Sequence, residues 1–275
     1  MRTLIALLGV AMITSTPGIA PYQANRTSTG GLHFTIEGRG ASVVLIHAFQ
    51  MDLREWDDVA ARLEGKRHVL RYDVRGHGRS HVLDPLPSAV EDLRALLDEL
   101  QISRGALVGS SMGSTIAIDF ALTYPDRVDW LLLLSPGVPG IASPATFDWM
   151  KPIMMAVKEK NAAAAAALWW ESPLLAGLRT MPGAERYRAI VLDNARIWTI
   201  PHPPPPTLPP AGTRLNDVRV PVTTAAGELD LLGSIENART VAAGVPKGNY
   251  VSFANANHML SIERAEQISR LILER

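Results

Sequence analysis

Ser111 lies at the centre of a G-x-S-x-G motif that runs from Gly109 to Gly113 and directly follows a short apolar run. A strand that turns straight into a helix strains the backbone of its central residue, and it needs small residues two positions to either side. The two glycines meet this need around Ser111, whereas a motif centred on the preceding serine would place Val108 and Met112 there. The pattern therefore indicates Ser111 as a serine nucleophile.

A serine hydroxyl is a poor nucleophile near neutral pH, so this interpretation requires a histidine base and a carboxylate that orients it. The chain has seven histidines, and His258 lies between a strand-like run at 250–253 and a helix predicted from 261 to 274. Loops at the carboxyl ends of strands collect catalytic groups in open α/β sheets. We therefore predict that His258 is the general base.

The carboxylate is expected directly after another apolar run, at 220–226. Asp230 is the candidate, and Glu228 is the alternative. Serine, aspartate and histidine then follow one another in the chain order of the α/β-hydrolase fold, which differs from the orders of chymotrypsin and subtilisin. The three assignments support one another, because each residue supplies what the other two require.

The remaining histidines are expected to take no part in the chemistry. His47 and His77 are predicted to hold loops in place by hydrogen bonds. Four more are predicted to lie at the surface or in loops: His33, His68, His81 and His202.

The elements that must position these residues alternate between strands and helices. The runs 32–37 and 43–46 are typical of strands and predict a hairpin with its turn at 38–40. The apolar run 130–135 predicts a buried strand, and the apolar spacing of 91–100 predicts a helix before the serine motif. Helix, strand, sharp turn and helix in this order form the setting that a nucleophilic serine needs.

Two further motifs resemble the α/β-hydrolase superfamily, and with the serine motif the resemblance spans most of the chain. The strand at 43–46 continues into His47-Ala48-Phe49-Gln50, which is similar to the family's H-G-x-x turn except that Ala48 replaces the glycine. The run from Asp73 to Ser80 is similar to the family's D-x-R-G-x-G-x-S loop. The resemblance implies an α/β fold with a mostly parallel eight-stranded sheet, flanking helices, and a helical cap inserted after the sixth strand.

The resemblance also implies an oxyanion hole made of two backbone amides. These are the amide of Phe49, in the turn after the strand, and the amide of Met112, next to the nucleophile. Removing one such donor typically costs about a hundred- to a thousandfold in rate. Ala48 precedes the first donor, so a larger residue than glycine at this place would narrow or tilt the hole.

A change of pattern after residue 135 sets the domain boundaries. Residues 136–218 are expected to form the cap, with a Pro-rich connector at 201–206, while 25–135 and 219–275 form the α/β-hydrolase core. The cap interval contains four of the six tryptophans, which are candidates for lining an apolar substrate pocket: Trp149, Trp169, Trp170 and Trp198. Ordinary packing between cap and core is the alternative for each of them.

Residues 1–24 differ from the rest of the chain and resemble a signal peptide or leader. Arg2 precedes an apolar stretch at 4–13 that is too short to span a bilayer. Gly18 and Ala20 provide the small residues of a cleavage site, although Pro21 is unfavourable directly after it. We expect export, to the periplasm or the medium, with an amphiphilic segment of a cytosolic enzyme as the alternative.

The composition limits the classes of partner. The chain has 27 basic and 27 acidic residues, so it offers no general attraction to nucleic acid or to an anionic membrane. It has no cysteine, which excludes disulfides, thiol nucleophiles and thiolate metal sites. Neither metal-ligand spacing nor a phosphate-binding loop is found, so no metal and no cofactor are predicted. We expect a small-molecule partner, no stable membrane span, and a monomer or small homo-oligomer.

The expected function is that of a serine hydrolase that cleaves a carboxylic ester or lactone of an uncharged, largely apolar small substrate through an acyl-enzyme on Ser111. The motif G-x-S-M-G resembles the esterase, enol-lactonase and carbon–carbon-bond hydrolase group of the superfamily. The alternatives are a carbon–carbon-bond hydrolase, a cofactor-free haloperoxidase or lyase-like member, and a non-catalytic small-molecule receptor on the same fold. An intact triad argues against the receptor.

Overall fold

The computed structural model describes residues 23–83, 86–141, 148–200 and 209–275. Its strands are β1 (Gln23–Thr27), β2 (His33–Gly38), β3 (Ser42–Ile46), β4 (His68–Tyr72), β5 (Gly105–Ser110), β6 (Val128–Leu134), β7 (Val222–Gly227) and β8 (Gly248–Phe253). Its α-helices are α1 (Asp57–Leu63), α2 (Ala89–Glu99), α3 (Met112–Thr123), α4 (Lys151–Lys158), α5 (Ala162–Trp170), α6 (Ala176–Arg179), α7 (Ala184–Asp193), α8 (Leu232–Gly244), α9 (Leu260–Glu263) and α10 (Ala265–Leu273). Short 3-10 helices are η1 (Leu53–Trp56), η2 (Pro125–Arg127), η3 (Asp148–Met150), η4 (Pro173–Leu175), η5 (Ala195–Thr199), η6 (Ala211–Thr213) and η7 (Leu215–Asp217).

The strands form one eight-stranded sheet in the order β1-β2-β4-β3-β5-β6-β7-β8. β1 and β2 are antiparallel to each other, β2 is antiparallel to β4, and all remaining neighbours are parallel. The mostly parallel sheet that the sequence predicts is confirmed. Both faces of such a sheet must be covered, which explains why its central strands are apolar nearly throughout.

The predicted hairpin is wrong. β2 and β3 are not paired, because β4 lies between them: Gly38 at the end of β2 and Ser42 at the start of β3 both pair with His68. Val43–Ile46 is buried on both faces and therefore takes a central position between two parallel neighbours. Local alternation identifies a strand, but it does not say which strand pairs with it.

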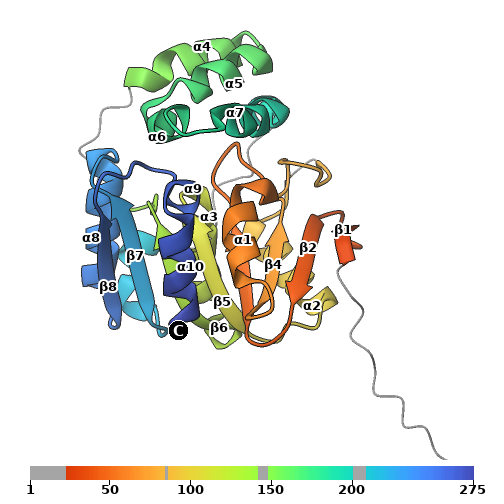
Figure 1. Ribbon diagram of the computed structural model, residues 1–275, viewed down its shortest axis with the longest axis vertical. Helices are drawn as coiled ribbons and strands as arrows, with labels where there is room; N and C mark the ends of the chain where they lie inside the picture. The colour runs from red at the N-terminus through yellow and green to blue at the C-terminus, as the bar shows by residue number, and fades with distance from the viewer. Residues whose placement is uncertain (1–22, 84–85, 142–147, 201–208) are drawn as a thin grey trace, which may run out of the picture.

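Helices cover the two faces of the sheet in separate groups (Figure 1). α2, α3 and α8 contribute to one apolar cluster with strand residues such as Leu107 and Leu131. α1 and α10 contribute to the other, with Leu45, Val108 and Leu132. In the residues that the structure describes, no helix is both long enough and apolar enough to cross a membrane.

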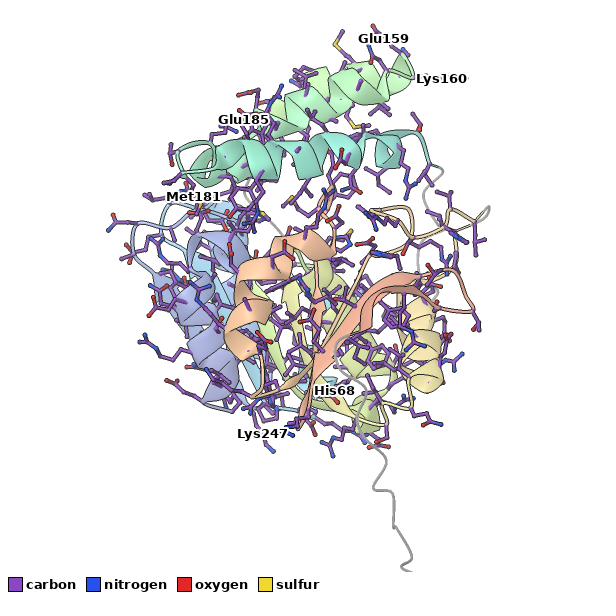
Figure 2. All side chains as sticks on the ribbon, turned by 45° about the vertical axis from the view of Figure 1, so that its right-hand side comes forward. His68, Glu159, Lys160, Met181, Glu185 and Lys247 are labelled. Atoms are coloured by element: carbon purple, nitrogen blue, oxygen red, sulfur yellow. The ribbon has the colours of Figure 1, made fainter. Side chains whose placement is uncertain are left out.

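The helices α4 to α7 come between β6 and β7 and form a separate layer (Figure 1). Figure 2 places Glu159, Lys160, Met181 and Glu185 of this layer at one end of the molecule, and His68 and Lys247, where β4 and β8 begin, at the other. The layer, called the cap below, therefore lies over the carboxyl ends of the parallel strands. Its apolar cluster includes core residues of two loops, among them Ala48 and Met259.

Polar contacts at the end of α7 fasten the cap to the core. Asn194 is fully buried, donates to an Asp52 carboxylate oxygen at 3.0 Å and accepts from the Gly78 amide at 2.6 Å. The Arg196 guanidinium donates to four carbonyl oxygens of the loop 76–80. Residues 1–22 of the predicted leader, the Pro-rich connector and His202 lie outside the described residues, and β1 begins at Gln23.

Candidate active site

Ser111 occupies a sharp turn between β5 and α3. Its backbone has φ 49° and ψ −108°, which lies outside the regions that residues with a side chain adopt without strain. Its amide donates to the Leu134 carbonyl at 2.8 Å, which fixes the turn against β6. The strand, strained serine and helix that the motif predicts are all present.

Sterics explain the two glycines of the motif. A Cβ on Gly109 would lie 2.3 Å from the Gly113 carbonyl carbon, and a Cβ on Gly113 would lie 2.1 Å from the Ile46 carbonyl oxygen. Neither position accepts a side chain without moving backbone. Ser114 replaces the glycine often found after the motif, and its hydroxyl donates to the Gly109 carbonyl at 2.8 Å, which closes the turn.

Asp230 and His258 come together although 28 residues separate them. His258 Nδ1 lies 2.8 Å from Asp230 Oδ1 and 3.0 Å from Oδ2, and both side chains are buried. Gly227 allows this approach, because a Cβ there would lie 2.1 Å from the Ala256 carbonyl oxygen in the histidine loop. The alternative carboxylate, Glu228, is exposed to solvent.

Electrostatics raise the pKa of His258 above its usual value. Burial alone would lower the pKa of this imidazole, but the Asp230 carboxylate, together with Glu263 and Glu55, outweighs burial. Glu263 also accepts hydrogen bonds from the Asn257 and Met259 amides, at 2.8 and 3.2 Å, on either side of the histidine. Asp230 thus holds the His258 ring, and Glu263 holds the backbone on either side of it.

Ser111 and His258 do not form a hydrogen bond to each other in the part of the chain that the structure describes. His258 Nε2 is buried and has no partner among the described residues. Catalytic hydrogen bonds are often long in enzymes without substrate and shorten only in the complex. The base nitrogen is therefore free to receive a proton, which is what the chemistry requires.

The Phe49 amide belongs to a tight turn at Ala48–Met51, which we call the oxyanion turn. The Ala48 carbonyl accepts from the Met51 amide at 3.1 Å, and Gln50 has a positive φ of 57°. Gln50 is buried and is bonded to the cap through both ends of its amide: it accepts from Trp198 Nε1 at 2.7 Å and donates to the Val191 carbonyl at 3.0 Å.

His47 orients this turn, in accord with its predicted structural role. Its Nε2 accepts from the Val74 amide at 2.9 Å, so the proton must be on Nδ1, which donates to the Ala48 carbonyl at 2.8 Å. The Phe49 amide donates to no acceptor in the described chain. Met112, as the first residue of α3, has no acceptor within its helix. Both predicted donors are thus available to a ligand.

Three of the four cap tryptophans gather around Phe49. The Phe49 ring makes edge contacts with Trp169 at 5.3 Å and with Trp198 at 5.0 Å, and the Trp149 ring packs tilted against Trp169 with the centroids 5.8 Å apart. Trp170 is buried in the same apolar cluster but outside this ring group. His77 also meets Phe49, and burial, with His47 nearby, lowers the pKa of His77 to about 3, so that its ring is neutral.

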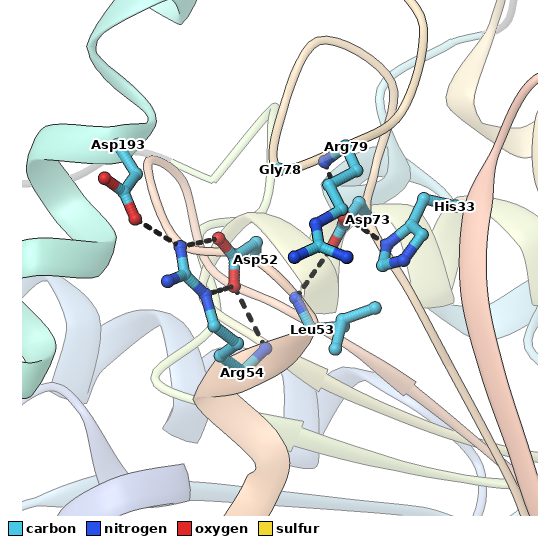
Figure 3. Close-up of a pocket in the computed structure, with 8 residues that line it drawn as sticks. All are labelled: His33, Asp52, Leu53, Arg54, Asp73, Gly78, Arg79 and Asp193. Atoms are coloured by element: carbon cyan, nitrogen blue, oxygen red, sulfur yellow. Dashed lines mark hydrogen bonds and ion pairs between the residues drawn. The ribbon is translucent and has the colours of Figure 1, made fainter. Parts of the chain in front are cut away.

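Asp73 explains the D-x-R-G-x-G-x-S loop (Figure 3). Its carboxylate accepts from His33 Nδ1 at 2.8 Å and from the amides of Leu53 and Arg79, at 2.8 and 2.7 Å. A Cβ on Gly78 would lie 2.1 Å from the same carboxylate. His33 was predicted at the surface or in a loop and is instead buried on β2, because this carboxylate lies beside the strand and satisfies its ring.

In the described ranges, no group of three or more histidine, aspartate or glutamate side chains is arranged to hold a metal ion. Three residues that shape the site were not identified from the sequence: Gln50, Glu55 and Glu263. Gln50 lies in the turn after β3, while Glu55 and Glu263 lie in the short helices η1 and α9. Gln50 and Glu55 are buried and Glu263 is partly buried because segments far along the chain cover them, and no spacing rule reveals that.

Comparison with known proteins agrees with this architecture. A family model described as alpha/beta hydrolase fold matches residues 41–172. The enol-lactonase of Burkholderia xenovorans LB400 superimposes with a TM-score of 0.70 over 92% of this chain and 98% of its own, at 23% identity, which is a likeness of fold. The chain has the α/β-hydrolase fold. The fold class inferred from the sequence is thereby confirmed.

The sequence relatives match different shares of this chain. Proteins of Mycobacterium tuberculosis and Mycobacterium bovis are 35% identical over 107 residues, which is 38% of this chain but only 31% of theirs. A 2-hydroxy-6-oxononadienedioate/2-hydroxy-6-oxononatrienedioate hydrolase of Pseudomonas putida is 28% identical over 88% of this chain and 90% of its own. The chain thus spans about a third of the first relatives and nearly all of the other.

Proposed function

We propose that this protein is a serine hydrolase that cleaves a carboxylic ester or lactone through an acyl-enzyme on Ser111. One observation carries the proposal. The Ser111 hydroxyl, His258 Nε2 and the Phe49 amide of the oxyanion turn all lack partners in the described residues. Buried polar groups are normally satisfied, and groups left open together are typical of a site that awaits a substrate.

The geometry supports a two-step mechanism. Ser111 Oγ attacks the carbonyl carbon while His258 Nε2 takes its proton, and Asp230 stabilises the resulting imidazolium through Nδ1. The amides of Phe49 and Met112 donate to the oxyanion. His258 then gives the proton to the departing alcohol oxygen. A water molecule, deprotonated by the same nitrogen, attacks the acyl carbon. The bond between that carbon and Ser111 Oγ then breaks as His258 returns the proton to Ser111 Oγ, which releases the acid and restores the serine.

An uncharged, largely apolar substrate fits the side chains near the turn. Phe49, Trp149, Trp169 and Trp198 form a neutral aromatic group, and His77 beside them is uncharged. Aromatic side chains bind apolar groups and exclude water, which strengthens the electrostatic interactions of the oxyanion hole. These residues are the proposed acyl-side contacts.

The proposal is tested by labelling with a fluorophosphonate and by turnover of p-nitrophenyl esters from acetyl to longer acyl chains. We expect a phosphonyl adduct on Ser111, seen by peptide mass spectrometry, and loss of adduct and turnover in Ser111→Ala. Ser110→Ala is the matched control, because it removes the same hydroxyl from the neighbouring serine, which is buried. An adduct on another residue, or turnover that survives in Ser111→Ala, would refute the mechanism.

Carbon–carbon-bond hydrolysis is a second candidate, because the Pseudomonas putida relative matches 88% of this chain. The substrate named for that relative is a dianion, whereas the aromatic group around Phe49 is neutral, which favours esters and lactones for this chain. A 2-hydroxy-6-oxo-dienoate tested in parallel distinguishes the two. Faster turnover of that compound than of any ester would reverse the order.

We also propose that residues 1–24 direct export. The basic residue, short apolar stretch and small residues of this segment support the proposal. Cell fractionation, with amino-terminal sequencing of the mature protein, tests it, and an intact amino terminus in the cytosolic fraction would refute it.

A further inference from the structure

Glu55 is a buried carboxylate that the proposed mechanism does not use. It lies in η1, eight residues after His47, and only 1% of its surface is exposed. Its Oε2 accepts from the Ala48 amide at 2.7 Å, and its Oε1 accepts from the Ser261 hydroxyl at 2.6 Å. Burying a carboxylate is costly unless it is well bonded, so a side chain of this kind needs an explanation.

The two partners of Glu55 belong to the two loops that the chemistry must align. Ala48 opens the oxyanion turn, and Ser261 lies in α9, which begins two residues after His258. We propose that Glu55 is a positioning residue that holds the oxyanion turn and the His258 loop in one fixed arrangement. The inference rests on the proposed function only in its effect on rate, because the arrangement itself is measurable without a substrate.

On the turn side, Glu55 helps to set the direction of the Phe49 amide. A trans peptide is planar, so the Phe49 N–H points away from the Ala48 carbonyl. That carbonyl is held by His47 Nδ1 and the Met51 amide, and the preceding peptide is held by Glu55 through the Ala48 amide. The peptide that carries the donor and the peptide before it are therefore both fixed.

On the histidine side, α9 is braced at two points. Ser261 is fully buried and bonds Glu55, while Glu263 accepts from the amides that flank His258. A shift of α9 would move the histidine, and the bond to Glu55 ties that shift to the oxyanion turn. A misplacement of about 1 Å can cost on the order of a hundredfold in rate, so hydrogen bonds that prevent such a shift would preserve the rate.

Glu55 also acts on His258 through charge. The groups that raise the pKa of His258 are Asp230, Glu263 and Glu55, from three different elements. Burial raises the pKa of Glu55 itself, while Ser261, the Ala48 amide and His47 oppose that rise. Removing the negative charge but not the hydrogen bonds should therefore lower the pKa of His258 and extend activity to lower pH.

The test compares Glu55→Gln with Glu55→Leu in the full-length protein. Glutamine keeps an acceptor for the Ala48 amide and a donor toward the Ser261 hydroxyl, whereas leucine fills the space and removes both bonds. We expect faster hydrogen–deuterium exchange at the Ala48 amide in Glu55→Leu, with kcat at least about tenfold lower and KM within about twofold. Glu55→Gln should restore slow exchange and most of kcat, with its acid limb at lower pH.

The inference is overturned if Glu55→Leu keeps the exchange rate of the wild type at Ala48, or if it keeps kcat within about twofold. Ser261→Ala provides a second, milder variant should Glu55→Leu fail to fold, and it should loosen the turn in the same direction. If the wild type hydrolyses no ester, the proposed function fails, while the exchange measurement still decides the role of Glu55.

Discussion

The part of the chain that the structure describes contains two aspartate–histidine pairs of nearly equal geometry. In each, the histidine Nδ1 lies 2.8 Å from a carboxylate oxygen, and the histidines, His258 and His33, are 5% and 6% exposed. The Nε2 atom of both rings is buried without a partner in the described residues. Distance and burial alone do not tell which pair is the proposed catalytic one.

The surroundings of the pairs differ. His33 is fixed within β2, and its partner Asp73 also accepts two backbone amides, so this pair fastens a loop to the sheet. His258 lies on a loop whose following helix is bonded to the oxyanion turn through Glu55. A histidine and an aspartate become a base only when their loop is aligned with a nucleophile and an oxyanion hole.

The largest difference is expected between His258→Gln and His33→Gln. Loss of the base should reduce kcat by about a millionfold, as is typical when one member of a triad is removed. His33→Gln should leave kcat within about tenfold. Ester turnover by both purified variants checks this, with circular dichroism as a control for folding. Equal losses of kcat would contradict the assignment of different roles to the two pairs.

Substitutions of the two aspartates should also differ in their effects on kcat and on stability. Asp230→Asn should lower kcat by about ten-thousandfold, because the amide favours the wrong imidazole tautomer. Asp73→Asn should change kcat little but lower the free energy of unfolding by about 2–3 kcal/mol, since a buried set of hydrogen bonds loses its charged acceptor. Urea denaturation and kinetics on the same samples measure both quantities.

The pH profile sharpens the distinction further. His258 must be neutral to act as a base, and its carboxylates raise its pKa, so kcat/KM should rise with pH to a plateau above the usual histidine value of about 6.5. Glu263→Gln removes one negative charge and should move this limb to lower pH. His33→Gln is the control and should leave the limb in place.

The pKa of His77 is shifted in the opposite direction to that of His258. Its pKa of about 3 in the folded protein lies below that of the unfolded chain, so protons bind the unfolded state more readily below about pH 6.5. The free energy of unfolding should therefore fall by about 1.4 kcal/mol for each pH unit between about 6.5 and 3 on account of this residue. His77→Asn should flatten the slope by that amount, and an unchanged slope would contradict it.

The smallest effect is expected at the strained turn of Ser111; no such turn accompanies the His33–Asp73 pair in the described residues. Ser111→Gly should be more stable than Ser111→Ala by about 1 kcal/mol, because glycine adopts φ 49° and ψ −108° at less cost. Both variants should be inactive, so thermal unfolding alone compares them. A less stable glycine variant would show that the turn stores no strain.

The sequence is sufficient where local sterics decide the structure. Gly109, Gly113 and the apolar run before them leave one conformation for Ser111, and the fold class implied by the resemblance of these local motifs to the α/β-hydrolase superfamily is confirmed. It is insufficient where pairing is decided over long distances. The separation of β2 from β3 by β4 and the burial of His33 depend on strands and carboxylates far along the chain.

The candidate site divides in the same way. Asp230 and His258 follow recognisable strands, and the structure brings them together. Glu55, in contrast, is a charged residue that directly follows Arg54 in a short helix, a pattern typical of an exposed position. Its burial results from α9, which lies about two hundred residues later in the chain.

The two hydrogen bonds from Gln50 to the cap have a consequence for how a substrate enters. Because the side chain of this turn residue is bonded to both Trp198 and the Val191 carbonyl, the cap cannot lift from the core without breaking those bonds or pulling the oxyanion turn with it. If opening of the cap pulls on this turn, the Phe49 amide would leave the position that the proposed mechanism needs. Under the proposed mechanism, cap closure over the substrate would then also assemble the oxyanion hole, and Ser111 would be activated only where the cap excludes bulk water.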